Sequence, residues 1–279
     1  MISNRRIAAS FRDPSGFLFQ REGLVYRQIN MVYKDNYDYL MSSGLYSDLV
    51  NNKLLIPHEE TKTEDPLPDG VYKIIAPRLV HFISYPYEWC FSQLKKAALV
   101  TLEIQKKSLE FGMSLRDCSA YNIQFIGANA VFIDTLSFKK YQEGQLWPAY
   151  KQFCQHFLGP LALMSYTDIR LNKLSQVYID GIPLDLTSRL LPLKTCFRFP
   201  LFSHIHLHAK GQTHFADKNL DISKRKISRL ALNGLIDNLY SAVEKLNWQP
   251  DKTEWADYYR DTNYSQESLN HKKNLWQNF

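Results

Sequence analysis

The sequence predicts an α+β protein with two lobes, a small β-rich lobe followed by a larger helical lobe. Short apolar runs separated by turn sequences fill residues 5–30, and this pattern is typical of antiparallel strands. From Glu88 onward, apolar residues recur at helical spacing instead. The 279 residues, 45% of them hydrophobic and 22% charged, suffice for one large domain or two modest ones with a substantial core.

The β-rich lobe is expected over residues 1–87. The turn sequences "DPSG" at 13–16 and "REG" at 21–23 separate short apolar runs, so we expect two or three antiparallel strands. A polar segment with three prolines follows at 56–70, which we expect to be a loop or a strand edge, and β character returns at 71–89.

Three segments have apolar residues at helical spacing. Residues 33–55 predict a helix that Gly44 divides into two pieces. Residues 88–113 predict one long amphipathic helix, and residues 146–166 predict an apolar helix broken by a Gly-Pro pair. The helical lobe is therefore expected over 88–247, with a polar, aromatic and helical tail at 248–279.

The bulk composition narrows the choice of partner and compartment. The net charge is +6, but the basic residues are scattered apart from 223–229, so the sequence does not favour a nucleic-acid partner. The four cysteines include no C-x-x-C pair, which is typical of a reduced, cytoplasmic protein. A secretory signal and an apolar run long enough to span a bilayer are both absent from the sequence.

Three polar residues stand beside apolar runs in "MSLRDCSAYNIQF" and "VFIDTLSF". They are Asp117, Asn122 and Asp134. Two carboxylates and an amide brought together can hold a divalent metal and a phosphate, although each residue could equally serve as a turn residue. The stretch between Asn122 and Asp134, "IQFIGANAVFID", predicts a two-strand hairpin that would hold both residues at its ends.

A long helix, a D-x-x-x-x-N loop and a strand ending in Asp occur in this order. The chain thereby resembles the kinase-like fold, nearest in brevity to aminoglycoside phosphotransferases and fructosamine kinases. This resemblance implies that Asp117 is the catalytic base. It also implies that Asn122 and Asp134 hold Mg²⁺ against the phosphates of ATP.

The chain departs from the kinase pattern at several positions. Leu115 stands where kinases have His, "DTL" replaces D-F-G, and "DPSG" would have to cover the phosphates with one glycine. The lysine that grips the phosphates has two candidate replacements, Arg27 in "LVYRQI" and Lys73 in "VYKII". No glutamate occurs in 33–55 to pair with either. These residues predict nucleotide binding with slow or no phosphoryl transfer.

A second resemblance rests on longer stretches of sequence. "SYPYEWCFSQLKKAALVTLEIQKKSLEFGMSLRDCSAYNIQF", "WPAYKQFCQHFLGPLALMSY" and "HIHLHA" resemble the N-terminal region of bacterial class I SAM-dependent methyltransferases, some of them labelled nodulation proteins. The resemblance implies that a methyltransferase domain with a D-x-G-x-x-x-G loop follows, whereas this sequence ends at Phe279 before such a loop.

Two functions are therefore expected from the sequence. The first is a kinase-like accessory region of a SAM-dependent methyltransferase, which binds a substrate, a partner or a nucleotide. Its partner would be a methyltransferase domain or subunit, and SAM would be bound only there. The alternative is a small-molecule phosphotransferase that uses ATP and Mg²⁺.

A histidine-rich segment offers a further candidate site. In "FSHIHLHAKG", His204, His206 and His208 would share one face if the segment were extended, and His214 could add a fourth zinc ligand. The alternative is a half-buried strand or loop whose histidines form hydrogen bonds with the backbone.

Aromatic residues gather in "SYPYEWCF" at the expected junction of the lobes. Tyr85, Tyr87 and Trp89 could wall an adenine or substrate pocket. The sequence favours packing over a pocket for these rings, and Glu88 is expected to cap the following helix.

Overall fold

The structure is a computed structural model, and it describes residues 5–7, 13–61, 70–209, 226–249 and 263–277. These residues form two compact units, one within 1–247 and the other within 248–279. The second unit contains the helix α11 (Gln266–Gln277). In the described residues, no helix has the length and apolar character that crossing a membrane requires.

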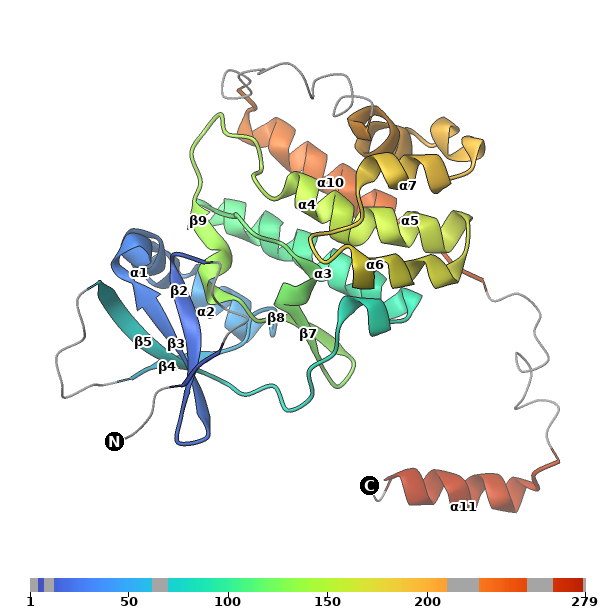
Figure 1. Ribbon diagram of the computed structural model, residues 1–279, viewed down its shortest axis with the longest axis horizontal. Helices are drawn as coiled ribbons and strands as arrows, with labels where there is room; N and C mark the ends of the chain where they lie inside the picture. Colours follow the sequence, from blue (N-terminus) through green and yellow to red (C-terminus); the bar gives the residue numbers. More distant parts are fainter. Residues whose placement is uncertain (1–4, 8–12, 62–69, 210–225, 250–262, 278–279) are drawn as a thin grey trace. The chain divides into compact units, whose positions relative to one another are not determined.

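The first unit begins with a five-stranded antiparallel sheet, drawn in blue to teal in Figure 1. The turn between its second and third strands places Glu22 at φ 52° and Gly23 at φ 79°, and this confirms the predicted "REG" turn. The strands lie in the order β1-β2-β3-β5-β4 and comprise β1 (Arg5–Arg6), β2 (Gly16–Arg21), β3 (Leu24–Asn30), β4 (His58–Glu60) and β5 (Val71–Pro77).

Two short helices lie between β3 and β4 in the chain. These are α1 (Lys34–Ser42) and α2 (Leu45–Asn51), and Gly44, at φ 88°, separates them as predicted. A small buried cluster joins this region to the sheet and reaches residue Leu136 of the following lobe; its other members are Ile29, Tyr33, Tyr37 and Ile75.

The predicted β character after β5 is only partly correct. The strand ends at Pro77, and the chain then runs without regular structure to a short 3₁₀ turn at Pro86–Glu88. Proline has no backbone N–H to donate to a sheet, which fits the end of the strand at Pro77 and the 3₁₀ turn that begins at Pro86.

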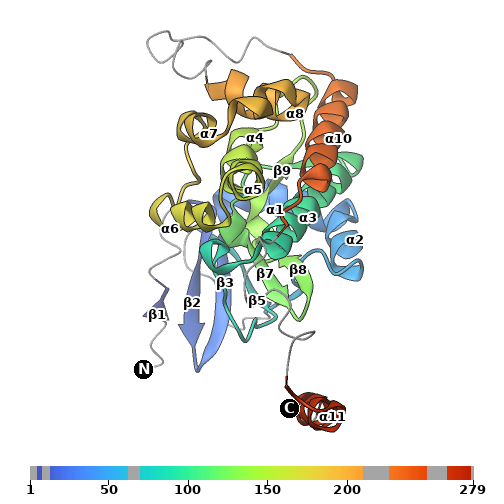
Figure 2. The same cartoon turned by 90° about the vertical axis from the view of Figure 1, so that its right-hand side faces the viewer.

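The helical lobe is built on α3 (Phe91–Glu110), as the amphipathic pattern predicts. One face of α3 is buried in the main core, and α10 (Arg229–Lys245) packs beside it (Figure 2). Gly112 follows the helix at φ 72°, a left-handed conformation that favours glycine. The side chain of Lys95 in α3 reaches the end of α10, where its Nζ donates to the carbonyl oxygens of Glu244 and Leu246.

Two antiparallel pairs follow α3. The first pairs β6 (Met113–Leu115) with β9 (Phe138–Lys140), and the second pairs β7 (Ile123–Ile126) with β8 (Asn129–Phe132). The second pair confirms the predicted hairpin, with its turn at Gly127. As a result, the segments that carry Asp117, Asn122 and Asp134 all emerge beside these strands.

The predicted helix break at Gly159-Pro160 is wrong. A π-helical turn at Cys154–Leu158 leads directly into α5, so the helix continues through the Gly-Pro pair. Further helical segments complete the lobe; they are α4 (Tyr150–Phe153), α5 (Gly159–Tyr166), α6 (Leu174–Val177), α7 (Leu184–Leu190), α8 (Phe199–Leu201) and a π-helical turn at Phe202–Leu207.

The predicted fold class is thus confirmed: a small β-rich part precedes a larger helical part, and the long helix and the hairpin follow in the expected order. The boundary placed between residues 87 and 88 stays a prediction.

Candidate functional site

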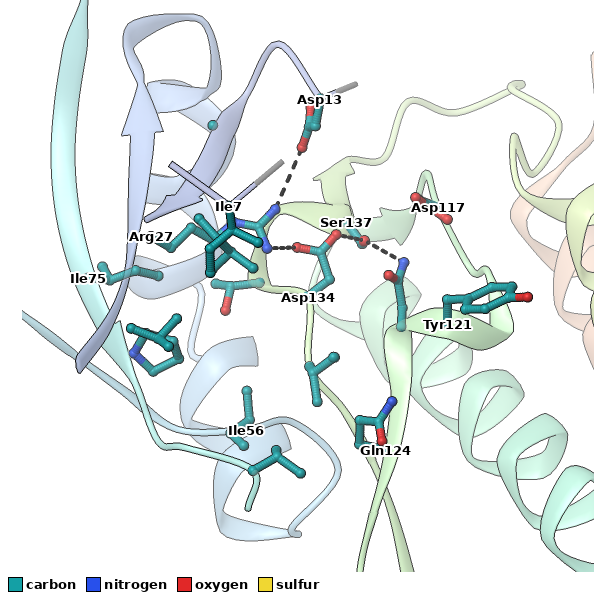
Figure 3. Close-up of a pocket in the computed structure, with 18 of the residues that line it drawn as sticks. Ile7, Asp13, Arg27, Ile56, Ile75, Asp117, Tyr121, Gln124, Asp134 and Ser137 are labelled. Carbon is teal, nitrogen blue, oxygen red and sulfur yellow. Dashed lines mark hydrogen bonds and ion pairs between the residues drawn. The ribbon is translucent and has the colours of Figure 1, made fainter. Parts of the chain in front are cut away.

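A cavity of about 900 Å³ lies where the five-stranded sheet faces the β7–β8 hairpin (Figure 3). Its volume is within the range of pockets that bind small molecules. One part of its wall is apolar and the other part is polar. The apolar part includes Ile7, Leu18, Val25, Ile56, Ile75 and Ile133.

Asp134 lies at the centre of the polar wall. It follows β8 and caps the next 3₁₀ turn, where its Oδ1 accepts from the backbone N–H of Leu136 at 3.1 Å. Its Oδ2 accepts from the hydroxyl of Ser137. The guanidinium of Arg27 completes the set, with Nη1 2.7 Å from Asp134 Oδ1. Both side chains are 14% exposed, so the ion pair is largely shielded from solvent.

Arg27 comes from β3, where it faces Ile75 of β5 across the sheet. Its Nη2 lies 3.7 Å from Asp13 Oδ2, so the guanidinium stands between two carboxylates (Figure 3). The Nε of Arg27 is buried and has no hydrogen-bond partner among the described residues. An unpaired buried N–H is costly, so the described residues leave the hydrogen bonding of this guanidinium incomplete.

Asp13 is shared with a second guanidinium. Arg116 Nη2 donates to Asp13 Oδ1 at 3.1 Å and to the hydroxyl of Ser15 at 2.7 Å. The Nε of Arg116 donates to the Leu136 carbonyl at 3.0 Å, which fixes the plane of the guanidinium. Arg27, Arg116, Asp13 and Asp134 thus form an alternating cluster with two charges of each sign.

Asp117 and Asn122 lie on the same polar wall. Asp117 Oδ1 accepts from the backbone N–H of Ser119 at 2.9 Å and from Gln152 Nε2 at 2.8 Å. Asn122 Nδ2 donates to the hydroxyl of Ser137 at 3.3 Å. The structure therefore brings together Arg27, Asp117, Asn122 and Asp134, four of the residues predicted from the sequence.

Lys73 is not brought to this cavity. Its Nζ lies 2.5 Å from Glu60 Oε2 and 5.5 Å from the ring centroid of Tyr37. Among the described residues that line the cavity there is no lysine. Of the two candidate cations, Arg27 lines the cavity and Lys73 does not.

The aromatic residues of "SYPYEWCF" have different surroundings: one lines the cavity and another is buried in the core. Tyr85 lines the cavity and stacks on Tyr87, with ring centroids 5.5 Å apart. Trp89 is buried in the core, where its Nε1 donates to Ser84 Oγ at 2.9 Å. The expectation that Glu88 caps the following helix is wrong: the N-cap of α3 is Cys90, and the Glu88 carboxylate instead accepts from the backbone N–H of Tyr85 in the 3₁₀ turn Pro86–Glu88.

The extended conformation assumed for the histidine segment is wrong. The segment is helical, so alternate residues point in different directions. His204 bonds with Tyr150 and Asn238, whereas His206 bonds with Ser188 and Thr195.

These separate partners also remove the basis for the zinc hypothesis. Each of the two imidazoles has its ring nitrogens engaged by side chains of different segments. The described residues contain no group of His, Cys, Asp or Glu side chains suited to a metal. His214, the fourth proposed ligand, lies outside the described residues.

Sequence reasoning missed several residues of the polar wall. Asp13 stands in the "DPSG" turn and Arg116 directly precedes Asp117, so the local sequence held a signal for both. Ser137 and Gln124 gave no such signal, because their roles depend on contacts between distant segments. Gln124, for example, pairs its side-chain amide with both the N–H and the C=O of Ser84 at 3.0 Å.

Comparison with known proteins adds a relative and a structural neighbour. No protein-family model matches the chain. The chain is 33% identical over 267 residues to the nodulation protein NoeA of Rhizobium meliloti (strain 1021), a match that covers 93% of this chain and 56% of that protein. The chain therefore spans about half the length of this curated relative. The solved structure of vaccinia related kinase 3 covers 99% of this chain and 86% of its own, with 12% identity and a TM-score of 0.38.

Proposed function

We propose that this chain is a kinase-like accessory region of a longer, methyltransferase-type protein and that its cavity binds a nucleoside phosphate. The observation that carries the proposal is the position of Arg27. Its guanidinium lies in a cavity with apolar walls and keeps one buried donor without a partner among the described residues. A base and sugar fit against the apolar wall, and a phosphate fits a guanidinium.

The methyltransferase part of the proposal rests on sequence. The chain resembles N-terminal regions of SAM-dependent methyltransferases, and it matches 56% of the length of a nodulation protein. We infer that methyl transfer and SAM binding belong to a domain or subunit outside these residues. In this proposal the cavity described above supplies ligand recognition to that partner.

Phosphoryl transfer is the less favoured alternative. The carboxyl group of Asp117 is positioned on the polar wall, as a base in such a reaction would be. However, the described cavity residues include no lysine, and Asp134 is already paired with Arg27. This arrangement supports binding more than transfer.

Thermal unfolding in the presence of ATP and MgCl₂ tests the proposed binding. A ligand that binds only the folded protein raises the melting temperature, by roughly 5 to 10 °C at a concentration of about 100 times Kd. Ile133→Trp places a large side chain in the cavity wall and is expected to abolish this rise.

Ile126→Trp is the matched control, because Ile126 lies at the exposed tip of the same hairpin. It should keep the full rise in melting temperature. The proposal would be refuted if ATP did not stabilise the wild-type protein, or if it stabilised the Ile133→Trp variant equally.

A further inference from the structure

A divalent metal at Asn122 and Asp134 does not fit the side chains as they lie. The carboxylate of Asp134 accepts from the Leu136 N–H and from the Ser137 hydroxyl, and it forms an ion pair with Arg27 at 2.7 Å. An ion bound to the same carboxylate would be within a few ångströms of a permanent positive charge. The metal and the guanidinium therefore compete for Asp134.

Asn122 contacts this network through its amide nitrogen, an atom that does not bind a metal. Its Nδ2, a donor, points to the Ser137 hydroxyl, and that hydroxyl in turn donates to Asp134. The three side chains form a directional chain of hydrogen bonds that ends on the carboxylate (Figure 3). This chain of hydrogen bonds holds the carboxylate of Asp134 in place beside Arg27.

Arg27 provides a permanent positive charge at this site. A guanidinium stays charged at every physiological pH and presents five N–H donors in a fixed plane that matches a phosphate. Nη1 is paired with Asp134 at 2.7 Å, while Nη2 is 3.7 Å from Asp13, beyond hydrogen-bond distance, and Nε has no partner among the described residues. Donor capacity for an anionic group therefore remains after the ion pair is formed.

We propose that Arg27 replaces the divalent metal at this site, so that the cavity binds nucleoside phosphates without a metal ion. The inference rests on the proposed nucleotide-binding function. It narrows the ligand to the free nucleoside phosphate rather than its magnesium complex.

Isothermal titration of the full chain with ATP tests the inference when it is carried out in excess EDTA and, separately, in excess MgCl₂. We expect binding in EDTA at least as tight as in MgCl₂. A loss of affinity of about tenfold or more in EDTA would overturn metal independence while leaving nucleotide binding intact. The absence of binding in both buffers would instead refute the proposed function itself.

The Arg27→Gln variant distinguishes ATP binding that depends on the guanidinium of Arg27 from binding that depends on Mg²⁺. Loss of a charge-assisted hydrogen bond should lower the affinity for ATP in EDTA by about tenfold or more. Because the variant also releases Asp134, MgCl₂ should then restore part of the affinity, and the variant becomes metal-dependent. Unchanged binding in EDTA would overturn the role of Arg27.

Arg21→Gln is the matched control, since Arg21 is exposed at the end of β2 and does not line the cavity. It should bind ATP as the wild-type protein does in both buffers. Circular dichroism and the melting temperature of each variant show whether it is folded. The comparison of EDTA with MgCl₂ on the wild-type protein tests the inference even if Arg27→Gln does not fold.

Discussion

Asp13 is the residue whose position is most informative about the ligand. Its carboxylate lies between two guanidinium groups, 3.1 Å from Arg116 and 3.7 Å from Arg27. An anion between two arginines is the arrangement expected for a bound phosphate. We therefore interpret Asp13 as an internal competitor, a negative group that a phosphate must displace or repel when it reaches Arg27.

Removing this competitor should tighten binding. In Asp13→Asn the two guanidinium groups lose a charged partner, so we expect the affinity for ATP to rise about tenfold, equivalent to 1.4 kcal/mol. Isothermal titration measures the change. Glu59→Gln removes an exposed negative charge from β4 and is expected to leave the affinity unchanged. Weaker binding by Asp13→Asn would show that Asp13 orients the arginines instead of competing with the ligand.

The β2 strand depends on a glycine at its start. Gly16 pairs with Ile29 of β3, and a Cβ atom added to it would lie 2.0 Å from the Gln28 carbonyl oxygen and 2.9 Å from Leu136 Cδ1. Both distances are shorter than the non-bonded contacts that Cβ atoms make in proteins. The absence of a side chain therefore lets β2 approach both β3 and the turn that carries Asp134.

Gly16→Ala should destabilise the protein by about 1–3 kcal/mol, because a backbone atom must move to accept the methyl group. Gly234→Ala provides the contrast. Gly234 lies within α10, and a Cβ there meets no atom within 4 Å, so alanine should stabilise the helix by roughly 0.5–1 kcal/mol. Urea unfolding curves measure both. Equal effects of the two substitutions would contradict the close approach at Gly16.

Regular elements were predictable where a local pattern determines them. The helical spacing of residues 88–113 predicted α3, and the apolar runs around Gly127 predicted the hairpin, because burial of one face requires these periods. The prediction for the histidine segment was wrong because there the local pattern does not determine the structure. Its alternation of His with apolar residues resembles a strand, yet tertiary contacts to Tyr150 and Asn238 are made from a helix.

Pairing between distant segments was not predictable from local sequence. The polar residues at Asp117, Asn122 and Asp134 were recognised by their spacing, and Arg27 by its strand. That Arg27 would pair with Asp134 depends on how the sheet of the first lobe faces the hairpin of the second. Neither secondary-structure propensity nor hydrophobic periodicity encodes the distance between the side chains of Arg27 and Asp134.

Burial couples the stability of the whole unit to pH. His156 lies in the π-helical turn before α5 and is 6% exposed. Burial lowers its pKa to about 4, and the opposing effect of the negative charge of Asp180 is smaller. In the unfolded chain the imidazole regains its ordinary pKa of 6.5, so the unfolded state binds more protons between these two values.

The free energy of unfolding should therefore fall as the pH is lowered from 6.5 to about 4, by up to about 1.4 kcal/mol per pH unit from this histidine. Urea unfolding at a series of pH values measures the slope. His156→Gln removes one titrating group and should reduce the slope, while His58, whose pKa burial also lowers to about 4, keeps part of it. His81→Gln controls for the loss of an exposed imidazole. An unchanged slope in His156→Gln would contradict the assignment.

Contacts between distant segments also bear on how a ligand can enter. The hydroxyl of Tyr33 donates to the Phe138 carbonyl at 2.6 Å, the backbone N–H of Lys140 donates to Asn36 at 3.0 Å, and Gln124 holds Ser84 by two hydrogen bonds. These bonds tie the region of the sheet and α1 to the helical lobe on more than one side. A hinge motion that separated the sheet from the helical lobe would break all of these hydrogen bonds together. Ligand exchange should therefore proceed through local motions of side chains and loops, on the picosecond to microsecond time scale, rather than through a slower hinge motion.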